Sequence, residues 1–426
     1  MAEAIFETDL GPFLSKALEW SKSFRQVALF QSNDFSDPYG KLSLLMAVDA
    51  AAEFSALAGK ALEGLNAFRN AYPNQWLPGF LAYDLKNEIE ALSSRHEDRL
   101  DFPDAYFFVP KIIIRTVGDD IAIRADNPVA IFQAIDQTKL TSSTHRFQGT
   151  LKTRMNKQAY SQAFDQLRGH IKKGDIYEAN LCQEFFATDS ELQQPELFYQ
   201  ALNRISPTPF SAYFKWNSRY IFCASPERFL AKRGKQLISQ PIKGTAPRGQ
   251  TPEEDERLKL QLLHSQKEKA ENVMIVDLVR NDLTRSATPG SVHVAEKLAV
   301  YSFQQVHQMI STVICEQHPA LSETQVIEHT FPPGSMTGAP KISAMRLCDQ
   351  FEASRRGVYS GSIGYFAPDG DFDFNVVIRS VLYNADKRYL SFHTGSAITI
   401  DANAEHEYQE CYTKASAIFQ ALGQNL

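Results

Sequence analysis

Short turns between apolar runs of strand-forming residues are the feature that most narrows the possible folds of this chain. A connection of only a few residues joins antiparallel neighbours, because a parallel pair needs a long crossover. The pattern occurs at 112–123 around Gly118-Asp119-Asp120, at 210–224 around Asn217-Ser218, and at 361–393 with turns at Asp369-Gly370-Asp371 and Ala385-Asp386-Lys387. The chain is therefore predicted to contain antiparallel sheet.

Helical spacing appears between these strands. Tyr160, Phe164, Leu167 and Ile171 recur at helical intervals, Gly174 supplies a C-terminal cap, and 176–181 begins a strand. Further helices are expected from near Pro252 to Leu278, around Val306-His307-Gln308, over 341–351, and over 407–419. The polar, irregular stretch 136–152 is the expected boundary between an N-terminal portion, 1–145, and a second portion, 150–424.

Composition excludes several classes of protein. The 426 residues are 43% hydrophobic and 22% charged, as in a globular protein. The net charge of −6, without a Lys/Arg cluster interleaved with aromatic residues, argues against nucleic-acid binding. The most apolar run, 273–279, is interrupted by Asp277, and the N-terminus is acidic, so neither a membrane span nor a signal peptide is expected. Five isolated cysteines fit reduced thiols in a cytoplasm.

Lys243 is the first candidate catalytic residue. It lies between the strand-like run 236–240 and the turn Gly244-Thr245. A lysine at a strand end, beside a glycine that leaves backbone N–H groups open to a ligand, is suitably mounted to be a reactive amine. The alternative is a solvated turn lysine.

Glu227 is the second candidate. It follows the strand 220–224, among the apolar neighbours of Ser225-Pro226-Glu227-Arg228-Phe229. A carboxylate in such surroundings has a raised pKa and can act as a general acid. A salt bridge between Glu227 and the adjacent Arg228 is the alternative interpretation.

A pair of glutamates, Glu268 and Glu271, lies on a helical stripe that becomes apolar one turn later, at Ile275. Two ionised carboxylates on a partly buried face repel each other and need a cation, and hard oxygen ligands favour Mg²⁺. Alternatively, Lys267 and Lys269 neutralise an exposed first turn of the helix.

A second pair, Glu407 and Glu410, repeats this arrangement near the C-terminus, with Lys414 on the same stripe. Because the two Glu-x-x-Glu pairs lie on separate helices, they are predicted to be two halves of one Mg²⁺ site.

Two further segments suggest an anionic ligand. The loop 331–341 contains three prolines and two glycines, which either expose backbone N–H groups to an anion or simply lead into the next helix. Arg379 is expected in the middle of the strand 372–383. An arginine there needs an anionic partner, either a structural carboxylate or a ligand.

These segments are similar to those of the chorismate-utilising enzymes, over nearly the whole chain. The most specific matches are SPERF (225–229), PIKGT (241–245), KEKAENVMIVDLVRNDL (267–283), PPGSMTGAPK (332–341), VIRS (377–380) and EYQECYTKA (407–415). ALFQSND (28–34) resembles a segment that forms a tryptophan pocket in relatives. The resemblance implies an α+β fold, an antiparallel β-sandwich core wrapped by helices, which the N-terminal portion completes and whose chorismate-binding region is 150–424.

The resemblance also implies roles for individual residues. Glu271 and Glu410 would hold Mg²⁺, with Glu268 and Glu407 around it, against the ring carboxylate of chorismate. The enolpyruvyl carboxylate would meet Tyr359, Arg379 and the backbone at Gly395. The rest of the cradle would be Gly244, Thr245, His307, Thr337 and Lys414.

The implied chemistry joins Lys243 and Glu227. The lysine would add to C2 of chorismate while Glu227 protonates the departing C4 hydroxyl, and ammonia would then enter at C4. Lys243 must be neutral to react, so burial is expected to lower its pKa.

Lys243 also distinguishes between branches of the family. Anthranilate synthases carry alanine at its position, whereas PIKGT resembles members that make 4-amino-4-deoxychorismate, for para-aminobenzoate and folate synthesis. Two residues depart from the family pattern: Glu178 replaces the glutamine common in amino-transferring members, and Ala397 replaces a second glycine. Gln31 stands where tryptophan-regulated relatives often have glutamate.

No Gly-x-Cys-x-Gly motif surrounds a cysteine, so ammonia is expected from a separate glutamine amidotransferase subunit. An anthranilate synthase component I and a catalytically silent chorismate- or tryptophan-binding relative are the alternatives. The silent relative would have lost the acids or the lysine, and both are present.

Overall fold

A computed structural model describes residues 1–141, 144–304 and 306–424. The strands are β1 (Ala2–Phe6), β2 (Gln26–Gln31), β3 (Leu44–Ala56), β4 (Leu77–Leu81), β5 (Ala105–Val117), β6 (Asp120–Ala125), β7 (Arg146–Gln148), β8 (Lys152–Thr153), β9 (Glu178–Ala187), β10 (Glu191–Gln193), β11 (Phe210–Trp216), β12 (Arg219–Ser225), β13 (Arg228–Arg233), β14 (Gln236–Gln240), β15 (Ile242–Pro247), β16 (His293–Ser302), β17 (Val306–Glu316), β18 (Gly338–Ala339), β19 (Ser362–Phe366), β20 (Phe372–Val376), β21 (Ser380–Asn384) and β22 (Tyr389–Ile398). The helices are α1 (Leu10–Ser21), α2 (Ala61–Ala71), α3 (Lys86–Ile89), α4 (Pro128–Asp136), α5 (Lys157–Lys173), α6 (Pro195–Ile205), α7 (Pro252–His264), α8 (Gln266–Thr284), α9 (Glu323–Thr330), α10 (Lys341–Phe351) and α11 (Ala404–Ala421), with 3₁₀ turns at Tyr83–Leu85 and Gly334–Met336.

The strand pairing confirms the predicted antiparallel sheet. Twenty strands join through backbone hydrogen bonds into one network, and β7 pairs separately with β10. All of these pairings are antiparallel. The hairpin of β11 and β12 turns at Asn217, whose φ of 54° is one that asparagine tolerates in a turn.

The network folds over itself into a sandwich. The long strands β3 and β5 pair with each other along most of their length and connect the layer of β2, β11, β12, β21, β22 and β9 with the layer of β4, β19, β20, β13, β14 and β17. The rings of Phe80 from β4 and Phe214 from β11 meet edge to face, with centroids 5.5 Å apart, in the core between the layers.

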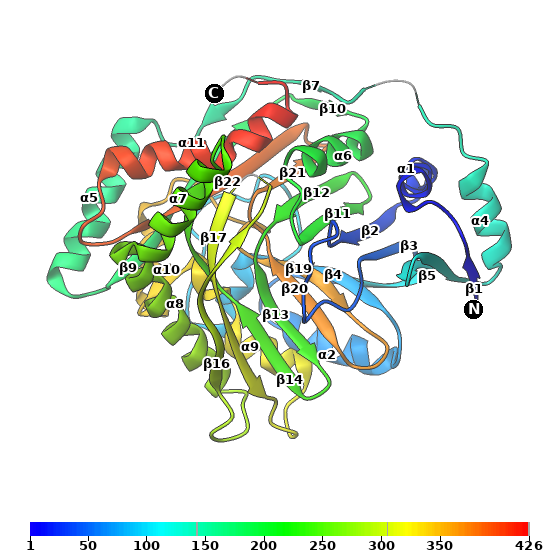
Figure 1. Cartoon of the computed structure of the whole chain (residues 1–426), viewed down its shortest axis with the longest axis horizontal. Coiled ribbons are helices and arrows are strands. Elements are labelled where there is room, and N and C mark those ends of the chain that lie inside the picture. The colour runs from blue at the N-terminus through cyan, green and yellow to red at the C-terminus, as the bar shows by residue number, and fades with distance from the viewer. Residues whose placement is uncertain (142–143, 305, 425–426) are drawn as a thin grey trace.

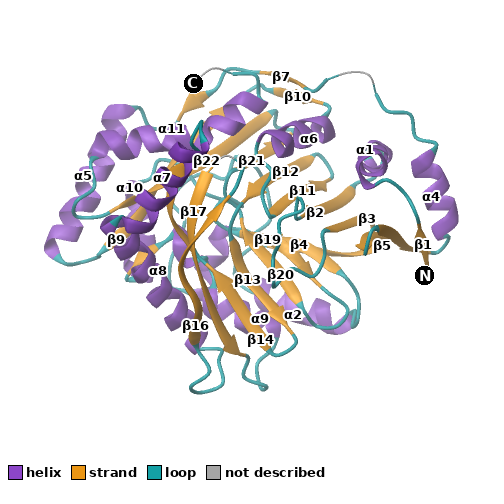
Figure 2. Ribbon diagram, viewed as in Figure 1, coloured by secondary structure: helices purple, strands orange, loops and turns teal. Residues whose placement is uncertain are grey.

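Helices cover the outer faces of this sandwich (Figure 2). One apolar cluster joins the β9–β22 layer to α1, α4, α6 and α11, and another joins α5, α10 and α11 to the start of β9. In Figure 1, α8 and α11 lie on the same side of the molecule, at the left, together with β17 and β22. The predicted α+β sandwich wrapped by helices is confirmed.

The N-terminal portion completes both layers. Its strand β2 pairs with β11, and its strand β4 pairs with β19. The two portions therefore share one sheet network, and the boundary between 1–145 and 150–424 stays a prediction.

Three predicted elements were wrong in detail. The strand expected over 372–383 is broken between β20 and β21, so Arg379 lies in the gap with a φ of 52°. The helix expected from Pro252 onward is two helices, because Ser265 leaves helical geometry and caps α8 through the Glu268 N–H. The residues around His307 form the start of strand β17 and not a helix.

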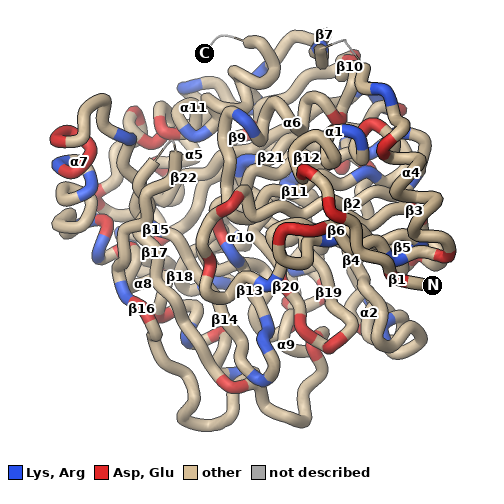
Figure 3. The backbone as a smooth tube through the Cα atoms, turned by 45° about the vertical axis from the view of Figure 1, so that its right-hand side comes forward, with Lys and Arg blue, Asp and Glu red and all other residues tan. Residues whose placement is uncertain are grey.

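Charges of both signs are spread over the visible elements in Figure 3, as expected for a net charge of −6. Within the described residues, no helix is long and apolar enough to span a bilayer.

Candidate active site

Lys243 is placed by an irregularity between β15 and β17. Ile242 lies opposite Ile310, but Thr245 lies opposite Gln308, so two residues, Lys243 and Gly244, occupy the space of one. Gly244 has a φ of +97°, which a side chain would strain. A bulge of this kind redirects a side chain out of the regular strand alternation, and the Lys243 amine points toward β9.

The partner of Lys243 is Glu178, the first residue of β9. Lys243 Nζ lies 2.7 Å from Glu178 Oε1, and both side chains are almost fully buried. Burial lowers the pKa of Lys243, but the charges of Glu178 and Glu271 outweigh burial and hold this pKa above its ordinary value. The expectation of a lowered pKa is therefore wrong for this state of the enzyme, in which the lysine is half of an ion pair.

Glu227 lies between β12 and β13 with 4% of its surface exposed. Burial raises its pKa to about 7, although the Ile242 backbone and the charges of Lys243 and Lys414 act in the opposite direction. Arg228 turns away to Asp37 at 2.5 Å and Asp373 at 3.0 Å. The alternative of a Glu227–Arg228 salt bridge is therefore wrong, and Glu227 has the properties of a general acid near neutral pH.

The two glutamate pairs come together on α8 and α11. Lys267 lies between them, with Nζ 3.8 Å from Glu271 Oε1 and 3.9 Å from Glu407 Oε1. A Cβ built on Gly244 would lie 3.1 Å from Oε2 of Glu268, so this carboxylate lies next to the Lys243 strand. The predicted acids are thus gathered beside the predicted nucleophile.

Burial raises the pKa of three of the four acids. It raises the pKa of Glu271 to about 7 and raises those of Glu268 and Glu407. For Glu410 the effect of burial is outweighed by Lys414, which donates to Oε1 at 2.6 Å and holds the pKa of that carboxyl below its ordinary value. The four glutamates of α8 and α11 together carry more negative charge than the nearby lysines neutralise, and a bound cation would supply the missing positive charge.

The donor set fits a hard cation. Oε1 of Glu271 is buried and accepts no hydrogen bond, so a carboxylate oxygen is left over for a ligand. The acids are all-oxygen donors, as Mg²⁺ prefers. As the side chains stand, the described part of the chain holds no group of three or more His, Cys, Asp or Glu residues close enough to bind a metal ion, and the Lys267 ammonium lies between the two helices instead.

A second group of predicted site residues gathers around Arg379. Arg379 donates from Nη1 to the carbonyl oxygen of Lys414 at 2.7 Å, and among the described residues it has no carboxylate partner. Lys414 donates from Nζ to the carbonyl oxygen of Gly395 at 2.8 Å. Tyr359, buried and stacked on His393 with ring centroids 4.9 Å apart, adds its hydroxyl to the surroundings of Arg379. Of the two interpretations of Arg379, a structural carboxylate partner is not found among the described residues, and binding of a ligand stays a prediction.

Thr337 and Thr245 lie on two different segments of the predicted site. The Thr337 carbonyl accepts from the Asn180 N–H at 2.9 Å, which fixes the loop to β9, while Thr245 follows Gly244 on β15 and is exposed. His307 lies opposite Ala246, in the strand next to Lys243.

The ring of His307 is already engaged. Its Nε2 lies 3.0 Å from Asp255 Oδ1, its Nδ1 lies 2.8 Å from Ser302 Oγ, and the residue is fully buried. In this arrangement the His307 ring connects β17 to α7 and β16 and presents no free ring nitrogen.

Sequence reasoning missed Asn272. This buried residue of α8 donates to the carbonyl oxygens of Lys243 at 3.3 Å and Met309 at 3.2 Å, and accepts from Ser311 Oγ at 2.6 Å. These hydrogen bonds fix the helix that carries Glu268 and Glu271 to the bulge that carries Lys243. Its position four residues after Glu268, on the buried stripe, was the available signal.

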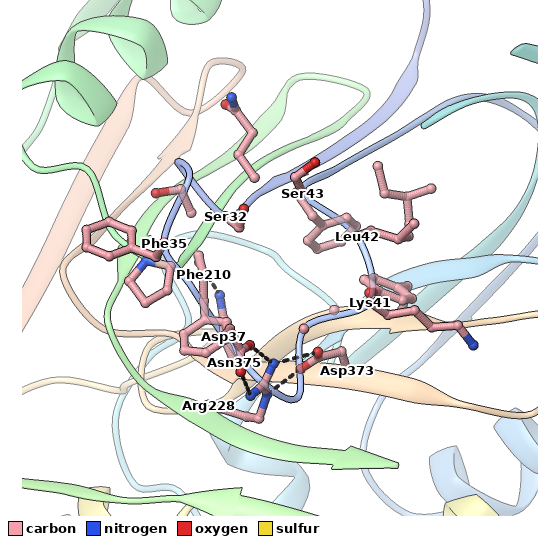
Figure 4. Close-up of a pocket in the computed structure, with 18 of the residues that line it drawn as sticks. Ser32, Phe35, Asp37, Lys41, Leu42, Ser43, Phe210, Arg228, Asp373 and Asn375 are labelled. Carbon is pink, nitrogen blue, oxygen red and sulfur yellow. Dashed lines mark hydrogen bonds and ion pairs between the residues drawn. The ribbon is translucent and has the colours of Figure 1, made fainter. Parts of the chain in front are cut away.

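A cavity of about 260 Å³ lies away from these residues, where ALFQSND faces β11, β19 and β20. Figure 4 shows Arg228, bonded to Asp37 and Asp373, at one end of it, and Ser32, Ser43 and Phe210 around it. The N-terminal segment singled out in the sequence therefore lines a cavity separate from the Lys243 site.

This chain is similar in sequence to known proteins. A family model described as chorismate binding enzyme matches residues 21–420. Aminodeoxychorismate synthase component 1 of Bacillus subtilis (strain 168) is 34% identical over 369 residues, which cover 81% of this chain and 76% of the relative. Anthranilate synthase component 1 of Thermus thermophilus is 32% identical over 363 residues, with the same coverages of 81% and 76%.

Solved structures agree with the fold. Anthranilate synthase component I from Streptococcus pneumoniae TIGR4 has a TM-score of 0.78 and 26% identity, covering 90% of this chain and 92% of its own. MenF, the menaquinone-specific isochorismate synthase from Escherichia coli, shares the fold at a TM-score of 0.78 with 17% identity, covering 99% and 95%. This chain belongs to the chorismate binding enzyme family.

Proposed function

We propose that this enzyme converts chorismate and ammonia into 4-amino-4-deoxychorismate and water. The observation that carries the proposal is the buried Lys243 amine beside the acids of α8 and α11, close enough to Glu227 for the lysine charge to lower the pKa of that carboxyl. Relatives named aminodeoxychorismate synthase component 1, from Bacillus subtilis and Escherichia coli, are each 34% identical to this chain and support the same choice.

The first half-reaction forms a covalent adduct. The lone pair of Lys243 Nζ bonds to C2 of the ring, the two ring double bonds shift by one position, and the C4–O bond breaks. Glu227 gives its proton to the departing oxygen, which leaves as water. A carboxyl with a pKa of about 7 is about half protonated at neutral pH, and the protonated fraction can supply that proton.

The second half-reaction reverses the shift. Ammonia bonds to C4, the double bonds return, and the C2–N bond breaks, which restores the Lys243 amine. The ammonium formed at C4 loses its proton to Glu227, so this residue ends the cycle protonated, as it began.

Substrate binding uses both charged faces. We propose that Glu271 and Glu410, with Glu268 and Glu407 around them, hold Mg²⁺ against the ring carboxylate. When bound, the ion neutralises that carboxylate and withdraws electron density from the ring. Arg379 and Tyr359, with the Gly395 backbone and Lys414, receive the other carboxylate, and Thr245 and Thr337 border the ring.

We further propose that ammonia comes from a separate glutamine amidotransferase subunit. All five cysteines are buried free thiols, so none is presented as an exposed nucleophile. Free thiols also suit a reducing compartment, and we propose the cytoplasm.

Product identification tests the proposal. The purified enzyme is incubated with chorismate, Mg²⁺ and an ammonium buffer at alkaline pH, and the products are separated by chromatography and identified by mass and ultraviolet spectrum. The expected product is 4-amino-4-deoxychorismate, and Lys243→Ala should lose it. The exposed Lys235 gives a matched control, Lys235→Ala, that should behave as wild type. Anthranilate as the product would favour an anthranilate synthase, and unconsumed chorismate would favour a silent relative.

A further inference from the structure

Glu178 and Lys243 form an ion pair whose two partners are each fixed by backbone contacts. Glu178 lies opposite Ala339 of β18, and the neighbouring Tyr177 N–H donates to the Ala339 carbonyl at 2.7 Å. A Cβ on Gly338 would lie only 2.2 Å from the Glu178 carbonyl oxygen, so the two backbones are in close contact. Asn272 fixes the other side through the Lys243 carbonyl. The 2.7 Å contact is therefore preorganised.

The second oxygen of Glu178 has no partner. Oε2 is buried and accepts no hydrogen bond, while Oε1 receives the lysine. An unpaired buried carboxylate oxygen is destabilising, because it has lost its hydrogen bonds to water. In a purely structural ion pair, both carboxylate oxygens would be expected to accept hydrogen bonds. A carboxylate that takes up a proton during the reaction can instead use a free oxygen to hold that proton.

The proposed reaction needs such a group, because Lys243 must lose a proton before it attacks. Four carboxylates face the lysine: Glu178 of β9, Glu227 of the β12–β13 connection, and Glu271 and Glu268 of α8. Glu227 must begin the cycle protonated to serve as the acid, and Glu268 and Glu271 are assigned to the cation. Among the described residues, only Glu178 is hydrogen-bonded to Nζ.

Resting on the proposed function, we propose that Glu178 is a catalytic residue, the proton acceptor of Lys243. As substrate binds, a proton moves from Nζ to a Glu178 oxygen, and the neutral amine attacks C2. When ammonia has displaced the lysine, Glu178 returns the same proton to Nζ. The transfer is internal, so the lysine proton never enters the solvent during a cycle.

Proton counting tests this assignment. Wild-type enzyme and Glu178→Gln are each premixed with Mg²⁺ and then mixed with chorismate in the absence of ammonia, in weakly buffered solution with a pH-indicator dye. The adduct is quantified by mass spectrometry of the same samples. Glutamine keeps the hydrogen bond to Lys243 but cannot take its proton. At pH 6 the variant should therefore release one more proton per adduct than wild type.

The difference between the two proteins is the readout, because proton uptake by Glu227 and the α8 acids is common to both. Glu323→Gln is the matched control: Glu323 lies 2.6 Å from Lys232 in another partly buried pair, and its variant should give the wild-type count. Glu178→Asp, which keeps a carboxylate, should do so too. Glu178→Asn repeats the test with a smaller side chain if the glutamine variant does not fold.

The two proposals fail in different ways. Equal proton counts for wild type and the amide variants, with adduct present in both, would overturn the role of Glu178 and leave the proposed function intact. No adduct in wild type under any of these conditions would overturn the covalent route and the role of Glu178 together.

Discussion

The guanidinium of Arg379 donates to the main-chain carbonyl oxygen of Lys414 at 2.7 Å. This bond connects the break between β20 and β21 to the helix that carries Glu407 and Glu410. Since the Lys414 ammonium donates in turn to the carbonyl of Gly395, three residues that we propose to receive one substrate carboxylate share a chain of hydrogen bonds. Helix α11 therefore connects Arg379 to the glutamates Glu407 and Glu410.

Arg379→Lys should impair substrate use much more than folding. A flexible ammonium cannot reproduce a planar guanidinium facing a carboxylate, and loss of such a bond is worth about 1.5–3 kcal/mol, or roughly a 10- to 150-fold fall in kcat/KM. Steady-state kinetics with varied chorismate and a thermal melt provide the measurement. Arg99→Lys, at an exposed arginine, is the control. An unchanged KM for chorismate would mean that Arg379 has a structural role.

Glu271→Gln and Glu410→Gln should each abolish Mg²⁺-dependent turnover and Mg²⁺ binding by calorimetry. Folding should be retained, because each substitution removes a charge from a group of mutually repelling acids. For Glu271 the substitution should even raise the melting temperature at pH 8, since its carboxyl, with a pKa of about 7, is ionised there at a cost. Glu256→Gln, at an exposed position of α7, should bind Mg²⁺ as wild type does. Normal Mg²⁺ dependence in both variants would contradict the assignment.

Wild-type enzyme held with Mg²⁺ and chorismate, without ammonia, should accumulate an adduct on Lys243 with the mass of chorismate less one water. Proteolysis and tandem mass spectrometry would locate it on the peptide that contains Lys243, and Lys235 should stay unmodified. Addition of ammonium should then discharge the adduct as product. An unmodified Lys243 in an enzyme that still turns over would limit this lysine to an electrostatic role.

Glu227 should make the stability of the protein depend on pH. Its pKa rises from an ordinary 4.5 to about 7 in the folded state, so between these values the folded chain binds a proton that the unfolded chain has lost. The contribution of Glu227 to the free energy of unfolding is therefore complete below about pH 4.5. This contribution is lost as the pH rises through 7, which lowers the free energy of unfolding by about 3 kcal/mol.

The Glu227→Gln variant tests this dependence. This variant should not lose stability through the titration of residue 227. Denaturant titrations should therefore give it a higher free energy of unfolding than wild type at pH 8 and a similar one at pH 5. Because other acids titrate in both proteins, the difference between them isolates Glu227. Parallel stability curves for the two proteins across this range would rule out the raised pKa.

The features that could be predicted from the sequence are those that depend on residues close together along the chain. The β11–β12 hairpin follows from a two-residue turn, and the glutamate stripes of α8 and α11 follow from helical spacing. Ser265 and Glu268 form a local Ser-x-x-Glu signal for the start of α8, although the helical periodicity begun near Pro252 continues across it.

Other features depend on distant contacts. Val376, Val377 and Ile378 have the composition of a continuous strand. The Val377 N–H nevertheless donates to the Gly361 carbonyl and the Ala224 N–H donates to the Arg379 carbonyl, outside the regular strand pairing, and β20 ends there. The Glu178–Lys243 pair joins residues 65 positions apart in the sequence, and no local pattern encodes it. It reverses the expected direction of the Lys243 pKa, because a neighbouring charge outweighs burial.

The pairing of β2 with β11 and of β4 with β19 has a consequence for how this chain can be divided. Removal of the N-terminal strands would leave the main-chain N–H and C=O groups of β11 and β19 facing solvent along two apolar sheet margins. Such margins recruit strands from other molecules. A fragment that begins after residue 150 would thus carry every residue of the Lys243 site and still be expected to self-associate into aggregates.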